Sequence, residues 1–214
     1  MASDIAQPAG THGVQIEHPA TSTGLPNMKL AMWLFLASDC LLFGALISTY
    51  VLYRGSSIVG PYPSDVFDIP YTSVSSFVLL ASSLTMVLAL AAIQRADHRR
   101  FRIWILATAL FGMTFIGGQV YEFTTFFKHD HLSLTTNLFG TTFYVLTGFH
   151  GTHVAIGILM LLSVFGLSLG GRITQDKAET VELIGLYWHF VDIVWIIIFT
   201  VVYLIPTGSP SGTP

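Results

Sequence analysis

The sequence is poor in charge, since Asp, Glu, Lys and Arg together make up 10% of its 214 residues and hydrophobic residues make up 52%. Soluble globular domains carry roughly 25% charged residues. With a mean hydropathy of +0.67, the composition therefore indicates a membrane protein. A net charge of -3 gives no reason to expect a nucleic-acid partner. Cysteine is nearly absent: Cys40 is the only one, which excludes an internal disulfide and a cysteine-rich metal site.

Long apolar runs account for this composition. A transmembrane helix needs about 20 apolar residues, and five stretches meet that length: residues 29–54, 71–94, 103–127, 137–169 and 181–205. The fourth is longer than a bilayer requires, so we expect it to tilt or to extend beyond the lipid. The sequence therefore predicts an all-α integral membrane bundle of five transmembrane helices without a separate soluble domain.

Basic residues are distributed unevenly between the two sides of this predicted bundle. Arg54 and Lys128 lie on one side, and the other seven lie on the side of the N-terminus. Because Lys and Arg accumulate in cytoplasmic loops, the asymmetry predicts a cytoplasmic N-terminus and a C-terminus outside. The seven are Lys29, Arg95, Arg99, Arg100, Arg102, Arg172 and Lys177.

Polar, turn-rich sequence flanks the predicted transmembrane domain, which covers residues 29–205. Residues 1–28 lack a basic start followed by a short apolar core, which argues against a cleaved signal peptide. We expect them to form a mobile N-terminal tail, and residues 206–214 to form a short flexible C-terminal tail.

Carboxylates inside the apolar runs are the first candidates for function, because a charge at the centre of a membrane helix costs roughly 2.5–3.5 kcal/mol on insertion scales. Asp39 lies ten residues beyond Lys29, which is about 15 Å along a helix and near the midplane. It is either a helix–helix hydrogen-bonding residue or a proton-active or lipid-facing carboxylate. Glu122 lies near the outer end of the third run, after Gly117 and Gly118. Its favoured role is structural, by pairing with a histidine or by capping loop amides.

Two further pairs of ionisable residues stand three apart, so each pair shares a helix face. His150 and His153 in the fourth run can ligate a metal at this spacing, but the zincin pattern His-Glu-x-x-His is absent. Neutral histidines that donate hydrogen bonds across a packed helix pair are the favoured interpretation. For His189 and Asp192 in the fifth run, we expect an internal polar network with His150, His153 or Glu122.

Four segments carry a family pattern: WLFLASDCLLFG at 33–44, QVYEF at 119–123, FYVLTGFHGTHVAIG at 143–157 and YWHFVDIVW at 187–195. In this order and within these spans they closely resemble subunit III of haem-copper terminal oxidases. The resemblance runs from about residue 29 to residue 205, and the combination is highly specific. With five predicted spans, the chain resembles the short bacterial form of this subunit, which lacks the first two helices of the seven-helix version.

The resemblance implies a non-catalytic subunit without haem or copper of its own. It would pack against subunit I, which reduces dioxygen to water and pumps protons, within a bacterial cytoplasmic membrane; subunit II and further small subunits complete such an enzyme. The family is thought to support proton uptake and turnover stability and to hold phospholipids in a cleft, which Asp39 would face. The family's polar motif positions, where hydrogen bonding and lipid contact are expected, fall on Glu122, His150, His153, His189 and Asp192.

The electron donor stays open at this point. Many family members carry Glu where this chain has Asp39, and the shorter side chain reaches less far. The Ser-Asp-Cys sequence around Asp39 resembles some quinol oxidases, whereas the Thr-Gly-Phe-His-Gly run resembles cytochrome c oxidases. We therefore expect a subunit of a cytochrome c oxidase and keep a quinol oxidase as the alternative.

Two other classes of membrane protein predict different sequence patterns. A proton-coupled carrier would favour inverted repeats or interrupted helices, and an intramembrane hydroxylase would need clustered histidine boxes. The sequence shows neither pattern.

Overall fold

The computed structural model describes residues 26–53, 69–128 and 138–205. Five helices in this part of the chain are long and apolar enough to cross a membrane, so the predicted all-helical bundle of five spans is confirmed. They are α1 (Asn27–Tyr53), α3 (Ile69–Gln94), α4 (His98–Lys128), α5 (Leu138–Leu169) and α6 (Ala178–Phe199). A 3-10 turn at Gln175–Lys177 precedes α6, and a π-helical turn at Thr200–Leu204 continues it.

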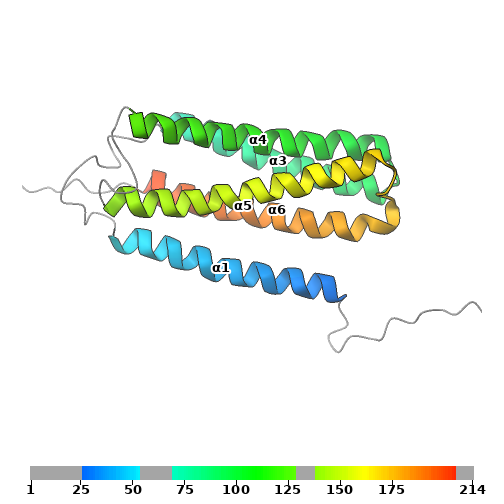
Figure 1. Cartoon of the computed structure of the whole chain (residues 1–214), viewed down its shortest axis with the longest axis horizontal. Helices are drawn as coiled ribbons and strands as arrows, with labels where there is room; N and C mark the ends of the chain where they lie inside the picture. The colour runs from blue at the N-terminus through cyan, green and yellow to red at the C-terminus, as the bar shows by residue number, and fades with distance from the viewer. Residues whose placement is uncertain (1–25, 54–68, 129–137, 206–214) are drawn as a thin grey trace, which may run out of the picture.

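The helices lie in three layers (Figure 1). α3 and α4 form one side, α5 and α6 the middle, and α1 the other side, where it packs against α5 and α6. The middle position of α6 explains why it is among the most buried helices, while α1 is the least buried. Most of the surface of α1 is thus left for lipid or for another protein.

Helix ends differ from the predicted ends by a few residues. α1 begins at Asn27, inside the predicted N-terminal tail, and α4 begins at His98, so that Arg100 lies in its first turn rather than in a loop. Asp97 explains this start: its Oδ1 accepts a hydrogen bond from the backbone N–H of Arg100 at 3.0 Å, as an N-cap residue does. Most of the two predicted tails, residues 1–25 and 206–214, lies outside the described residues.

Side-chain hydrogen bonds close one end of the bundle, where α1 and α4 begin and α3 and α5 end. Arg102 Nη2 donates to the carbonyl oxygen of Ser168 at 2.6 Å, and Arg102 Nε donates to Ser168 Oγ at 3.1 Å. Gln175 Nε2 donates to the carbonyl oxygen of Gln94 at 2.7 Å. The Arg102 Nη2 and Gln175 bonds go to carbonyl groups in the last turns of α5 and α3, which have no N–H partner within their own helices. We call this end, which also carries Lys29, the basic end.

Trp188 of α6 occupies a slot between three other helices. A Cβ at Gly112 of α4 would lie 2.6 Å from Trp188 Cη2, and a Cβ at Gly157 of α5 would lie 2.8 Å from Trp188 Cε3. The indole Nε1 donates to Ser82 Oγ of α3 at 2.9 Å. Small residues at helix contacts permit such close approach in membranes. Two glycines and one serine thereby fix the depth of α6 in the bundle.

Candidate functional site

The buried carboxylates and histidines fall into separate places in the bundle rather than one network. Asp39 and His153 meet between α1 and α5, whereas His189 and Asp192 of α6 bond to Ser83 of α3. The hydrogen bonds of His189 and Asp192 therefore go to a serine of α3 and not to His150, His153 or Glu122, the partners expected from the sequence.

Asp39 of α1 faces α5 near the middle of the membrane-spanning segments. Its Oδ2 lies 3.7 Å from His153 Nε2, and the two side chains are 10% and 13% exposed. His153 Nδ1 donates to the carbonyl oxygen of Phe149 at 2.8 Å, since a carbonyl can only accept. The Nε2 atom is therefore the one that faces the carboxylate. At 3.7 Å the two groups are in contact, but the distance is too long for a direct hydrogen bond.

Ser83 stands between His189 and Asp192. Its Oγ lies 2.9 Å from His189 Nδ1 and donates to Asp192 Oδ2. Because a serine hydroxyl has one proton, the bond with His189 requires the imidazole to donate from Nδ1. Hydrogen bonds therefore run from imidazole to hydroxyl to carboxylate. In a hydrolytic triad the imidazole instead accepts the serine proton, so this cluster does not activate a nucleophile.

Glu122 of α4 lies near the end of the bundle opposite to the basic end. Its Oε1 accepts hydrogen bonds from Thr72 Oγ1 of α3 at 3.0 Å and from Tyr203 Oη at 3.3 Å. Tyr203 belongs to the π-helical turn, where it is buried. The sequence pointed to a histidine or loop amides as partners, whereas these two bonds come from hydroxyl groups.

His150 is fully buried and faces α6. Its Nε2 donates to the carbonyl oxygen of Val191 at 3.2 Å, and its ring lies 4.9 Å from that of Trp195. His153 faces α1 instead, so the two histidines have different surroundings. Among the residues that the structure describes, no group of three or more His, Cys, Asp or Glu side chains is arranged to hold a metal ion.

Hydroxyl residues of α3 are the members of these clusters that sequence reasoning missed. Thr72 bonds to Glu122, Ser83 bonds to Asp192, and Ser76 Oγ accepts the indole N–H of Trp195 at 2.8 Å. Their spacing of four and seven residues places them on one face of the helix. This spacing indicates a polar face of the helix. Because Ser and Thr carry no charge and are common in membrane helices, the spacing alone does not identify them as site residues.

Fold and site together define a multi-pass membrane protein whose ionisable groups are hydrogen-bonded from helix to helix. Residues 3–207 match the family model of cytochrome c oxidase subunit III. The chain belongs to this family, whose members are non-catalytic subunits of haem-copper oxidases, and the resemblance drawn from the four segments is confirmed.

Relatives extend over most of the chain. Cytochrome c oxidase subunit 3 of Bacillus sp. (strain PS3) is 37% identical over 188 residues, which cover 88% of this chain and 90% of the relative. The protein of the same name from Thermostichus vulcanus is 39% identical, over 82% of this chain and 86% of its own. The probable quinol oxidase subunit 3 of Staphylococcus saprophyticus is 35% identical, over 83% and 88%.

Proposed function

We propose that this chain works as the non-catalytic subunit III of an aerobic terminal oxidase in a bacterial cytoplasmic membrane. The match to the family model over residues 3–207 carries the proposal. Membership in this family makes the chain part of an oxidase complex. Its direct contact with subunit I, which reduces dioxygen to water and pumps protons, and its association with subunit II and smaller subunits belong to the proposal.

Haem and copper are proposed to reside in the partner subunits. Membership in a family of non-catalytic subunits supports this division of labour. His150 Nε2 bonds to the carbonyl of Val191 in α6 and His189 Nδ1 bonds to Ser83 in α3, so these two rings join neighbouring helices. His153 Nδ1 bonds to the carbonyl of Phe149 in its own helix.

Asp39 is proposed to support proton uptake and turnover stability of subunit I, together with bound phospholipid. Its pairing with His153 in the membrane-spanning bundle supports a proton-related role. In the purified oxidase, Asp39→Ala is expected to change the phospholipid content or to shorten sustained turnover while the haem spectrum stays intact. Asp176→Ala, at an exposed position in the 3-10 turn at the basic end, is the control. Unchanged lipid content and unchanged turnover lifetime in Asp39→Ala would contradict this role.

Cytochrome c is the proposed electron donor, and a quinol is the second candidate. Relatives named for both donors occur at 34–39% identity, so overall similarity does not separate them. Oxygen uptake by the purified complex distinguishes the two directly. Turnover with reduced cytochrome c supports the first assignment, and turnover with a quinol alone supports the second.

A further inference from the structure

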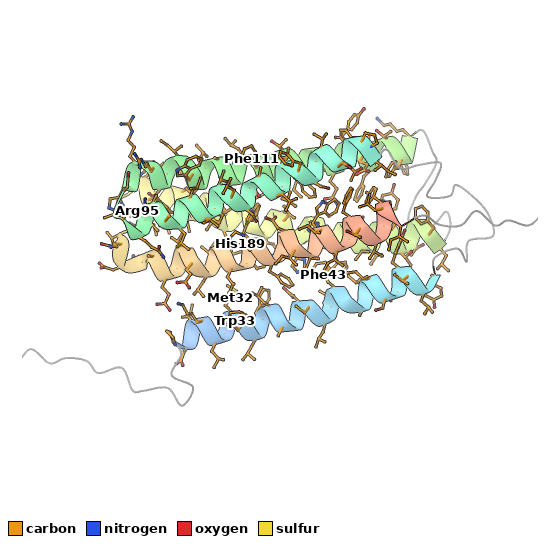
Figure 2. All side chains as sticks on the ribbon, turned by 180° about the vertical axis from the view of Figure 1, so that it is seen from behind. Met32, Trp33, Phe43, Arg95, Phe111 and His189 are labelled. Atoms are coloured by element: carbon orange, nitrogen blue, oxygen red, sulfur yellow. The ribbon has the colours of Figure 1, made fainter. Side chains whose placement is uncertain are left out.

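A cavity of about 190 Å³ lies between α1, α3 and α6. Figure 2 shows two of its lining residues, Trp33 on α1 and His189 on α6. Trp33 and Val87 of α3 are also 57% and 51% exposed on the surface of the bundle, so the cavity opens toward the membrane. Drug-sized ligands occupy pockets of about 300–1,000 Å³. This smaller volume suits a single six-membered ring with small substituents.

His189 is the deepest of the lining residues on α6 and presents a hydrogen-bond acceptor to the cavity. Its Nδ1 donates to Ser83 Oγ at 2.9 Å, and the serine proton goes to Asp192. The neutral imidazole therefore has a lone pair and no proton on Nε2. Within the part of the chain that the structure describes, no group donates a hydrogen bond to this nitrogen. A ligand that completes this end of the cavity must bring an O–H or N–H donor.

Glu182 provides a second acceptor at the basic end of the cavity. Its Oε1 and Oε2 lie 3.1 and 3.2 Å from Lys29 Nζ. A carboxylate has about four lone-pair sites, so Glu182 can accept a further hydrogen bond without losing the ion pair. Glu182 and His189 lie on one face of α6 at positions i and i+7, about 10.5 Å apart along the helix axis.

The walls between these two acceptors suit an aromatic ring. Trp33 can contact such a ring in an offset-stacked or edge-to-face arrangement. Met86 of α3 is buried and lines the same cavity, and a thioether sulfur makes favourable contacts with aromatic rings. A ring with two hydroxyl groups in para positions, each donating one hydrogen bond of about 2.8 Å, spans about 11 Å. This span matches the separation of the two acceptors.

We propose that this cavity binds the reduced headgroup of a membrane quinone, a para-hydroquinone. One hydroxyl donates to His189 Nε2 and the other to Glu182, while the ring lies against Trp33 and Met86. The isoprenoid tail leaves past Val87 into the bilayer. The inference goes beyond the proposed function, because it places a ligand in this chain whichever donor reduces subunit I, and it includes no electron transfer at the cavity.

The acceptors also determine which redox form of the ligand binds. The oxidised quinone has carbonyl oxygens, which only accept hydrogen bonds. One of these oxygens would face the lone pair of His189 Nε2, and an unpaired polar contact of this kind opposes binding. The cavity therefore binds the quinol in preference to the quinone.

The test uses the intact oxidase in nanodiscs, under argon with cyanide, and measures equilibrium binding of decylubiquinol and of decylubiquinone. Val87→Trp, which fills the cavity, is expected to remove one quinol site per complex, whereas Val74→Trp, at an exposed position of the same helix, removes none. At the site that Val87→Trp removes, His189→Phe is expected to lower the affinity for the quinol about fivefold, as for one hydrogen bond. The affinity for the quinone stays unchanged. His98→Phe, at an exposed position outside the cavity, is the control and changes neither affinity.

A second ligand tests the hydrogen bonds without any substitution at His189. The dimethyl ether of decylubiquinol keeps the ring and the tail but has no O–H, so it is expected to bind at least fivefold more weakly than the quinol. Equal affinities of the ether and the quinol at the site would overturn the inference, even if His189→Phe did not assemble.

Equal numbers of bound quinol in the wild type and in Val87→Trp would also overturn it, because every site would then lie elsewhere in the complex. A haem spectrum of the same samples tests the proposed function separately, since quinol binding is scored whether or not haem is present.

Discussion

Trp188 shows how single residues set the geometry of the bundle. The ring fits because Gly112 and Gly157 have no side chains, and Ser82 accepts its N–H. Sequence reasoning identified glycines beside polar motifs but not this slot, because the contact joins residues more than 30 positions apart. In such a closely packed contact, the stability lost on adding a side-chain atom depends on whether the neighbouring side chain can move away.

Gly112→Ala tests the slot. The new Cβ would lie 2.6 Å from the Trp188 ring and 3.0 Å from Ile158, so we expect a loss of about 1–3 kcal/mol in stability, as for overpacked cores. The measurement is the Tm of the purified complex. Gly117→Ala is the matched control on the same helix, because nothing lies within 4 Å of its Cβ position. Equal Tm values for the two variants would argue against a rigid slot.

Ser83→Ala tests the hydrogen bonds that join α3 to α6. Removing the hydroxyl leaves Asp192, which is 3% exposed, without its hydrogen bond from Ser83. A buried polar group without a partner costs about 1–3 kcal/mol, so the yield of intact complex and its Tm should both fall. Ser73→Ala is the control, since that exposed hydroxyl bonds only to the carbonyl of Ile69 in its own helix. A Tm of Ser83→Ala as high as that of the control would contradict the proposed importance of the cluster.

The ionisable residues and their partners were not equally predictable. Asp39 and Asp192 stand out because a charge in an apolar run is costly and needs a reason. Ser83 does not stand out, and the partner of a buried group is set by how two helices are rotated against each other. Rotation depends on three-dimensional packing, as around Trp188, which a single sequence does not contain.

At the scale of helices, the length and order of the five spans followed from hydropathy alone, because a bilayer imposes a minimum apolar length. Helix ends were less predictable. The start of α4 depends on a local hydrogen bond from Arg100 to Asp97, and the charged residues around it suggested a loop. The π-helical turn Thr200–Leu204 was not predictable from the sequence either. One additional residue in a turn does not change the pattern of a continuous apolar run.

Tyr203→Phe tests the contact that this π-helical turn makes with α4. The change removes the hydrogen bond of 3.3 Å from Tyr203 Oη to Glu122 Oε1 and keeps the aromatic ring. We expect a stability loss of about 1.5–3 kcal/mol, the range for hydrogen bonds to charged groups, measured as a lower Tm of the purified complex. Tyr53→Phe, at an exposed position at the end of α1, is the control. Equal Tm values for the two variants would contradict this explanation.

At the scale of the whole molecule, charge asymmetry predicts the orientation in the membrane. In a Cys40→Ser background, we expect Arg100→Cys to react with a membrane-impermeant maleimide only after the cells are permeabilised. Lys128→Cys should react in intact cells, since it lies at the opposite end of α4. The parent Cys40→Ser chain is the control for background labelling. The reverse pattern of labelling would show that the basic end faces outward.

Membership in an oxidase complex is tested most directly by purifying this chain from its native membrane in mild detergent. A reduced-minus-oxidised spectrum and mass spectrometry of the co-purifying proteins are then recorded on one sample. We predict a haem signal that belongs to a large co-purifying subunit I, with subunit II also present. A copper-binding motif in subunit II would indicate cytochrome c as the electron donor, and the lack of that motif would indicate a quinol. A colourless chain that purifies alone and stays folded would contradict the proposed function and favour a proton-coupled carrier.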